Sequence, residues 1–161
     1  MRSYRLLYNL VSLVMFGWVM AADRHSAVLY YVPGVWSLIM YLLQAVAAAM
    51  LLLCVKQTGA GDFMGVSQFK EGTRGPSKLV TSGFYALVRH PLYLISIIFL
   101  AMNPVMTVQW LLLTLLSVIY FLPGALLEEK RMVQEFGVDY LRYRQEVPFL
   151  LPRFFAKKRS V

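Results

Sequence analysis

Four long apolar runs constrain this chain more strongly than any other feature of its sequence. They cover residues 6–22, 28–55, 83–102 and 105–127. A helix of roughly 20 apolar residues is long enough to cross the hydrocarbon core of a bilayer. Because 59% of the residues are hydrophobic and 15% are charged, the chain is more apolar than a soluble domain. The sequence therefore predicts an all-α integral membrane protein with four transmembrane helices.

The third run contains Pro91, directly after Arg89 and His90. If residues 83–102 form one helix, that helix is long enough to span a bilayer. If the helix begins at Pro91, it has about 12 residues and a length of roughly 18 Å, which is too short. Proline lacks a backbone N–H, so we expect the helix to bend or break near Arg89 and His90.

The order of the segments predicts one domain over the whole chain. Residues 1–56 hold two N-terminal transmembrane helices, and Pro33-Gly34 indicates a late start or a bend in the second. Residues 57–82 contain five glycines and one proline, which is typical of a loop at the membrane surface. Residues 83–155 form the core that carries the candidate site. In this core the third and fourth runs make an antiparallel hairpin, and short C-terminal helices follow.

Positive charge lies almost entirely on one side of this topology. Four crossings place both termini and the central loop on the same side, which then holds 15 of the 16 Lys and Arg residues, while Arg24 lies opposite. By the positive-inside rule this side, with the candidate site, is cytoplasmic, and the membrane is the cell inner membrane if the chain is bacterial. Topology thus explains the net charge of +8, and nucleic acid is not an expected partner.

Two polar clusters end the apolar runs: Arg89-His90, and Glu128-Glu129 after the fourth run. Ionisable groups at membrane level usually face one another or a ligand. Adjacent helical residues point about 100° apart, so one glutamate is expected to hold a cationic ligand while the other orients Arg89 or His90. The alternatives are side chains that reach lipid phosphates and a solvated helix end. A metal is not expected, because His90 is the one histidine on this side and no ligand spacing is present.

The residues around both clusters resemble two signatures of a known family. The first comprises Val80-Thr81-Ser82-Gly83-Phe84-Tyr85 and Arg89-His90-Pro91-Leu92-Tyr93, and the second comprises Glu128-Glu129, Phe136-Gly137, Tyr140, Tyr143 and Val147-Pro148. Their order and separation over residues 78–153 resemble the isoprenylcysteine carboxyl methyltransferase-like family, which includes phospholipid N-methyltransferase-like proteins. The stretches 103–107 and 147–152 look most similar to its small-thiol S-methyltransferase branch.

The resemblance implies S-adenosylmethionine as the cofactor. The sulfonium and ammonium of this molecule suit Glu128 or Glu129, and its carboxylate suits Arg89 or the region of His90. The cofactor-binding residues implied in this way are Tyr85, Val88, Arg89, His90, Tyr93, Leu94, Glu128, Glu129, Tyr140 and Tyr143, and the catalytic residues are Arg89, Glu129 and Arg144. Ile95 departs from the pattern, because the family usually has glycine there for close approach of the backbone to the cofactor.

These interpretations predict an S-adenosylmethionine-dependent membrane methyltransferase. Its acceptor is a lipophilic or small molecule, such as an isoprenylcysteine carboxylate, a phospholipid amine or a thiol, and membrane lipid is the other expected partner. The sequence leaves the choice of acceptor and the oligomeric state open. Two alternatives stay open as well: a membrane reductase with a related C-terminal architecture that binds a nicotinamide cofactor, and a non-catalytic membrane partner protein.

Overall fold

A computed structural model describes residues 26–58 and 79–152, together with six residues of the first apolar run. The elements in chain order are strand β1 (Val28–Tyr31), helix α2 (Val35–Thr58), the short 3-10 helix η2 (Gly83–Ala86), helix α4 (Pro91–Ala101), strand β2 (Val105–Thr107), helix α5 (Val108–Phe136) and helix α6 (Val138–Glu146). The predicted helix over residues 6–22 as a whole, most of the predicted loop 57–82 and the basic C-terminal tail lie outside the described residues.

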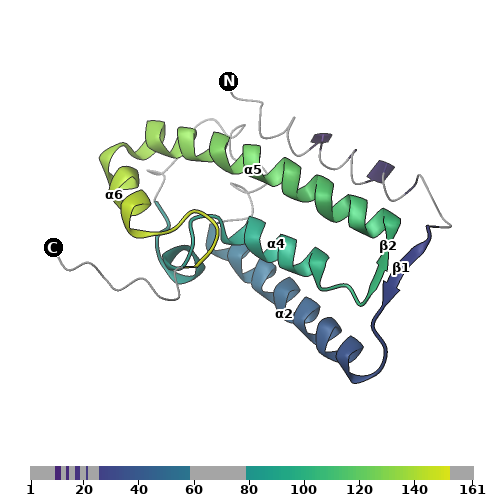
Figure 1. Cartoon of the computed structure of the whole chain (residues 1–161). Coiled ribbons are helices and arrows are strands. Elements are labelled where there is room, and N and C mark those ends of the chain that lie inside the picture. The colour runs from purple at the N-terminus through teal and green to yellow at the C-terminus, as the bar shows by residue number, and fades with distance from the viewer. Residues whose placement is uncertain are drawn as a thin grey trace.

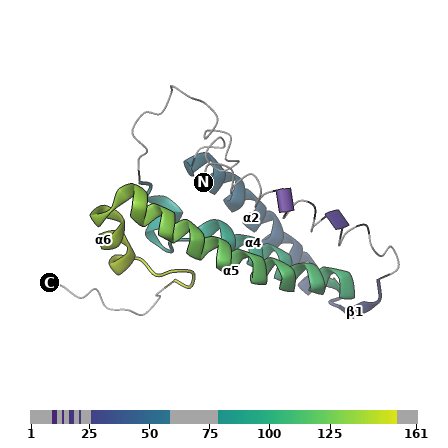
Figure 2. The ribbon, with the colours of Figure 1, turned by 90° about the horizontal axis from the view of Figure 1, so that it is seen from above.

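Helices α2, α4 and α5 lie side by side, with α4 between the other two (Figure 1). Seen from above, the axes of α4 and α5 are nearly aligned, whereas the axis of α2 crosses them at an angle (Figure 2). Helix α6 turns away from the end of α5, and the strands β1 and β2 lie at the opposite end of the molecule (Figure 1). This arrangement gives the described part of the chain two distinct ends.

Two helices of the described part are long and apolar enough to cross a membrane by length and composition, α2 and α5. The fold buries 11% and 22% of their most apolar windows, so most of this apolar surface is left for lipid or a partner. Helix α4 has 11 residues and a length of about 17 Å, which is too short to span alone. Four transmembrane helices are therefore not confirmed, because the third run supplies only a half-length helix.

The predicted break at the Arg-His-Pro segment is confirmed. Of the two alternatives for the third run, the structure has the shorter helix: Pro91 is the first residue of α4, a position where the missing N–H costs no intrahelical bond. The preceding η2 begins at Gly83, whose φ is +64°, and a Cβ there would lie 2.6 Å from Nε2 of Gln57. The positive φ favours glycine at this point, whereas the nearby atom belongs to the end of the flexible Gln57 side chain, which can move aside.

A two-stranded antiparallel ribbon corrects the all-α prediction. Tyr30 pairs with Met106 and Tyr31 with Val105, and the N–H of Val32 donates to the carbonyl of Pro104 at 2.9 Å. The late helix start indicated by Pro33-Gly34 is confirmed, since α2 begins at Val35. The strand residues before it find their partner far along the chain, and no local pattern in the sequence announces that pairing.

Helices α4 and α5 form the antiparallel hairpin that the sequence predicted. At one end, Nε1 of Trp110 donates to the carbonyl of Leu100 at 2.7 Å. At the other, the hydroxyl of Tyr93 donates to Oε2 of Glu128 at 3.4 Å. The side chain of Thr107 caps α5 by accepting a hydrogen bond from the N–H of Trp110 at 3.1 Å, which is the usual way to satisfy an open N–H of a first helical turn.

The buried apolar cluster of the described residues lies between α2 and α4 and not beside Arg89 and Glu129. Ala47, Cys54 and Ile95 are buried together, and Nε2 of Gln44 donates to the carbonyl of Phe99 at 3.0 Å. Ile95, which stands where the resembling family usually has glycine, thus points into the interface with α2. Its side chain is accounted for by helix packing, in which the small Ala47 lets the two backbones approach.

We expect replacement of Ile95 by alanine to destabilise the fold by on the order of 2 kcal/mol, because a buried side chain leaves a cavity against α2. Unfolding by denaturant in detergent micelles measures this loss. Ile98→Ala is the matched control, since Ile98 lies on the same helix and is 40% exposed. Equal effects of the two substitutions would contradict the assigned packing of Ile95.

Candidate active site

The backbone between η2 and α4 holds Arg89 and His90 in place. The N–H of Arg89 donates to the carbonyl of Pro148 at 2.9 Å, and the N–H of His90 donates to that of Phe149 at 3.3 Å. The carbonyl of His90 accepts the N–H of Leu94 at 3.2 Å, which begins α4. The segment after α6 therefore fixes the two side chains from a part of the chain about 60 residues away in sequence.

Helix α5 brings the second cluster to the same place. It continues through Pro123 to Phe136. Glu128 and Glu129 therefore lie on the same continuous helix as the apolar residues that precede them. Gly137, with a φ of +55°, separates α5 from α6. The turn at Gly137 places α6 across the end of the bundle (Figure 1).

Glu129 is the centre of the ionic contacts. Its Oε1 lies 2.9 Å from Nη1 of Arg89 and 3.4 Å from Nε2 of His90. Its Oε2 lies 3.5 Å from Nε of Arg144, a side chain that is 51% exposed. Residues from the entry of α4, the end of α5 and helix α6 thus meet at one carboxylate. The two clusters that the sequence separated by about 40 residues do converge.

The cluster is buried but incompletely hydrogen-bonded. The side chains of Arg89, His90 and Glu129 are 9%, 5% and 7% exposed. Four of their buried atoms lack a hydrogen-bond partner among the described residues: Nε and Nη1 of Arg89, Nε2 of His90 and Oε1 of Glu129. The charges are at ion-pair distance, yet the angles do not suit hydrogen bonds. Because unsatisfied buried polar groups are costly, this arrangement favours a polar ligand or water as the missing partner.

Glu128 has a different environment from its neighbour, as the helical geometry predicted. Its Oε2 accepts from the hydroxyl of Tyr93 at 3.4 Å and lies 3.9 Å from Nδ1 of His90. The ring of Tyr93 stacks between His90, at 5.6 Å, and Phe121, at 5.1 Å between centroids. Glu128 is also less buried than Glu129, with 32% of its side chain exposed. The two carboxylates therefore face different parts of the site.

Two tyrosines of α6 pack against the cluster. The hydroxyl of Tyr143 donates to the carbonyl of Tyr85 at 2.6 Å, and the rings of Tyr140 and Tyr143 lie 5.8 Å apart. Burial raises the pKa of Tyr143 to about 12, with Arg89 opposing and Glu129 adding to the shift. Burial, followed by Glu129, also raises the pKa of Tyr140. Both hydroxyls therefore stay protonated near neutral pH, and that of Tyr143 ties α6 to η2.

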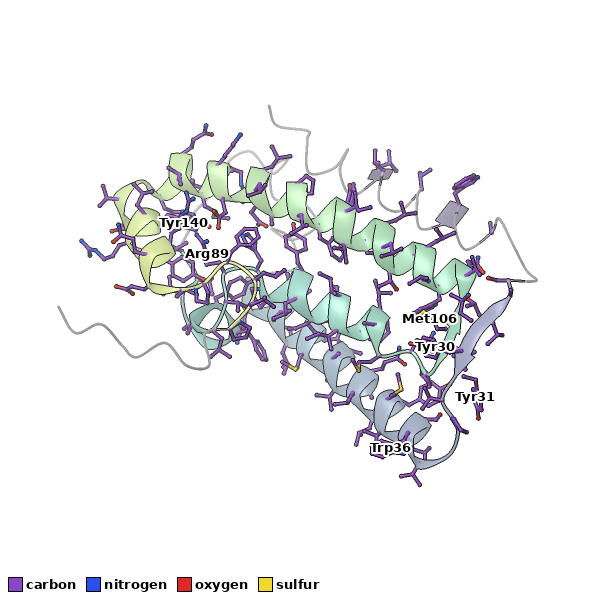
Figure 3. The ribbon with its side chains drawn as sticks, in the orientation of Figure 1. Tyr30, Tyr31, Trp36, Arg89, Met106 and Tyr140 are labelled. Carbon is purple, nitrogen blue, oxygen red and sulfur yellow. The ribbon has the colours of Figure 1, made fainter. Side chains whose placement is uncertain are left out.

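The other residues proposed from the sequence lie beside this group. Val88 is buried directly before Arg89, and Leu94 is half-buried in the first turn of α4. Figure 3 shows Arg89 and Tyr140 at the same end of the molecule, far from the strands. The structure thus gathers the proposed residues in one region, while their roles stay predictions. Within the described ranges, no three His, Cys, Asp or Glu side chains are placed so that they could hold a metal ion.

Phe149 was not among the site residues proposed from the sequence. Its ring lies 4.8 Å from the ring of His90 in an edge-on contact, and Cζ of Arg89 lies 5.5 Å over it. An aromatic face attracts a guanidinium when water is excluded. The signal that could have revealed this role is the adjacent Val147-Pro148 of the second signature.

Burial, with the neighbouring guanidinium of Arg89, lowers the pKa of His90 from 6.5 to about 4. Oε2 of Glu128 and Oε1 of Glu129 lie 3.9 Å and 3.4 Å from the two ring nitrogens, and burial outweighs the attraction of these carboxylates for a charged ring. His90 is therefore neutral at physiological pH. A neutral imidazole can both donate and accept a hydrogen bond, one at each ring nitrogen.

The fold and the site define a class of protein: an apolar helical chain with a buried charged site at one end of its long helices. The chain belongs to the family described as "Protein of unknown function (DUF1295)", whose model matches residues 25–147. Comparison with solved structures finds no match.

Curated relatives place the chain near methyltransferases. It is 37% identical over 128 residues to the methanethiol S-methyltransferase of Crocosphaera subtropica, covering 77% of this chain and 50% of the relative. It is 41% identical over 103 residues to methanethiol S-methyltransferase 2 of Bradyrhizobium diazoefficiens, covering 62% and 40%. The chain thus spans about half the length, or less, of the curated relatives it matches. The predicted resemblance to the small-thiol branch is confirmed.

Replacement of Tyr143 by phenylalanine removes the hydroxyl that binds the carbonyl of Tyr85. We expect the free energy of unfolding to fall by about 1 kcal/mol, the usual value for one intramolecular hydrogen bond. Denaturant unfolding of purified protein measures it. Tyr140→Phe is the control, since it removes the hydroxyl of the adjacent buried tyrosine and leaves the hydrogen bond between Tyr143 and Tyr85 in place. An unchanged stability in Tyr143→Phe would contradict the contact.

The lowered pKa of His90 makes stability depend on pH. In the unfolded chain His90 gains a proton below about pH 6.5, whereas the folded ring stays neutral down to about pH 4. Its contribution is therefore complete above pH 6.5 and is lost as the pH falls through this window. Unfolding measured between pH 7.5 and 4.5 (roughly that window) should show a steeper loss in the wild type than in His90→Gln. Parallel profiles would contradict the shift.

Proposed function

We propose that this chain is an S-adenosylmethionine-dependent membrane methyltransferase whose acceptor is a small thiol. The observation that carries the proposal is the buried Arg89–Glu129–His90 cluster, in which four buried polar atoms lie near one another without a hydrogen bond among the described residues. The similarity to relatives named methanethiol S-methyltransferase supports the reaction class and the acceptor. Because the chain spans about half the length of those relatives, binding and methyl transfer have to be measured on this chain directly.

The residues of the cluster fit the proposed cofactor by charge and donor type. S-adenosylmethionine presents a carboxylate, an ammonium and a sulfonium, and when bound it supplies an electrophilic methyl group. The unsatisfied Nε and Nη1 of Arg89 are donors for the carboxylate, since guanidinium–carboxylate pairs are among the strong charge-assisted bonds. The carboxylates of Glu128 and Glu129 suit the cationic groups. The aromatic rings of Tyr85 and Tyr93 offer apolar contact for the adenine.

The chain's own residues would make the site dry and ordered. Displacement at a methyl carbon depends on an in-line approach and on exclusion of water more than on a covalent nucleophile. Phe149, Val88 and Tyr140 cover the buried charges. Arg144, at half exposure, stands at the outer side of Glu129 and would close the site once the ligands are bound. Because its pKa is lowered to about 4, the neutral His90 would position the ligands by hydrogen bonds and would not act as a base.

The names of the relatives favour a small thiol over the other acceptors that the sequence left open. A thiol is nucleophilic as a thiolate and needs less assistance than a protonated amine. Lipophilic carboxylates and phospholipid amines are tested alongside it. We also propose that the chain is integral to the membrane with the site on the cytoplasmic side, which the positions of the positive charges support.

Purified protein in detergent should bind S-adenosylhomocysteine, seen as a rise in unfolding temperature, and should not respond to NADPH. Arg89→Lys and Glu129→Gln should weaken binding at least tenfold, a loss of about 1.4 kcal/mol or more. The first substitution removes the guanidinium fork that suits a carboxylate, and the second leaves the buried charge of Arg89 without its partner. Arg142→Lys is the matched control, since Arg142 is exposed on α6. Binding of NADPH without binding of S-adenosylhomocysteine would contradict the proposal and favour a membrane reductase.

Methyl transfer is tested with membranes that contain the protein, S-adenosylmethionine and methanethiol, by gas chromatography of dimethyl sulfide. Activity should appear with the wild type and with Arg142→Lys and should fall below detection with Glu129→Gln. Product formed from a carboxylate or an amine acceptor, and none from the thiol, would retain the enzyme class and overturn the acceptor. Binding without transfer to any acceptor would favour a non-catalytic partner protein.

A further inference from the structure

The end of the molecule that carries the strands differs in character from the candidate site. Tyr30, Tyr31 and Trp36 form what we term the aromatic end, and their side chains are 44%, 61% and 70% exposed. Figure 3 shows all three at the opposite end of the helices from Arg89 and Tyr140. Exposed tyrosine and tryptophan combine an apolar ring with a polar tip, so they suit a boundary between water and an apolar medium.

Charge is distributed along the same axis. Residues 26–55 and 90–127 contain no Lys, Arg, Asp or Glu. Helices α2 and α5 both begin at the aromatic end, and their first charged residues are Lys56 and Glu128, close to the candidate site. The described part of the molecule therefore has a charged end, an uncharged apolar middle and an uncharged aromatic end.

The apolar middle is exposed on most of its circumference. On α2, Ala47 and Cys54 form the buried side, and they lie seven residues apart on one narrow stripe. The exposed side chains point in several directions and include Val35, Leu38, Ile39, Leu42, Val46, Leu52 and Leu53. A helix that is apolar all round belongs in a large core or in a bilayer. Lipid can surround such a helix on all of its exposed sides, whereas a protein partner covers one side of it.

The strands indicate where the hydrocarbon ends. In the described part of the chain the sheet has two strands, so each strand has one edge without a neighbouring strand there, and unpaired backbone groups are not tolerated in hydrocarbon. The ribbon therefore requires the hydrated headgroup zone. The apolar span of α2 has 23 residues, or about 34 Å, which matches a hydrocarbon core of roughly 30 Å.

We propose that the aromatic end binds the headgroup boundary of the leaflet opposite to the one that borders the Arg89–Glu129–His90 cluster. Tyr30, Tyr31 and Trp36 would anchor the chain there and set its depth, while the ribbon joins the starts of the two long helices. This inference concerns the membrane surface and does not depend on the enzymatic activity.

Depth-dependent quenching in phosphatidylcholine bilayers tests the proposed anchor. The protein would carry Trp18→Phe and Trp110→Phe, so that Trp36 is the remaining fluorophore. Lipids brominated near the glycerol backbone should quench Trp36 more strongly than lipids brominated near the methyl ends. The matched control adds Trp36→Phe and Val46→Trp, which moves the fluorophore about 15 Å along α2 and should reverse the order. Deeper quenching of Trp36, or no quenching by either lipid, would overturn the proposal.

Sidedness is tested by thiol labelling in the Cys54→Ala background, which removes the single cysteine of the chain. Tyr31→Cys reports on the aromatic end and Arg142→Cys on exposed α6. A membrane-impermeant maleimide should label one of them in intact cells and the other only after permeabilisation. Labelling of both from the same side would overturn the placement in opposite leaflets, whatever the outcome of the enzymatic assays.

Discussion

The contact on which this structure depends is the sharing of the Glu129 carboxylate between two guanidiniums. Arg89 approaches one oxygen at 2.9 Å and Arg144 the other at 3.5 Å. A carboxylate that is buried and unpaired would be strongly destabilising. The pairing therefore ties together three parts of the chain: the entry to α4, the end of α5 and helix α6. In the proposed function the same carboxylate is also the counter-charge for a cationic ligand.

The short third helix explains how the charges come to be there. Because α4 begins at Pro91, the preceding residues do not continue as helix, and their N–H groups are free to bind the segment that follows α6. The carbonyls of Pro148 and Phe149 accept those N–H groups. A longer third helix would carry Arg89 and His90 on a helical surface and would leave that segment without its partners. The half-length helix is thus the feature that makes a buried polar site possible in so apolar a protein.

Local patterns predicted much of the fold and of the site. The proline break, the α4–α5 hairpin and the convergence of Arg89 with Glu129 are all present. The β1–β2 ribbon was missed because its strands are short and their pairing is non-local. Phe149 was missed because an aromatic residue in an apolar tail does not indicate which surface it covers. These failures share one cause: a side chain's neighbours depend on packing that local periodicity does not encode.

The amino-acid sequence by itself determined the apolar helices, their breaks at proline and glycine, and the segregation of charge to one end. These follow from hydrophobicity and from backbone chemistry, which are properties of each residue. The tertiary structure alone decided that Ile95 packs against α2, that Tyr143 binds the carbonyl of Tyr85, and that several buried polar atoms at Arg89, His90 and Glu129 have no hydrogen-bond partner among the described residues. These depend on the relative placement of α4, α5 and α6, which only the packed chain sets.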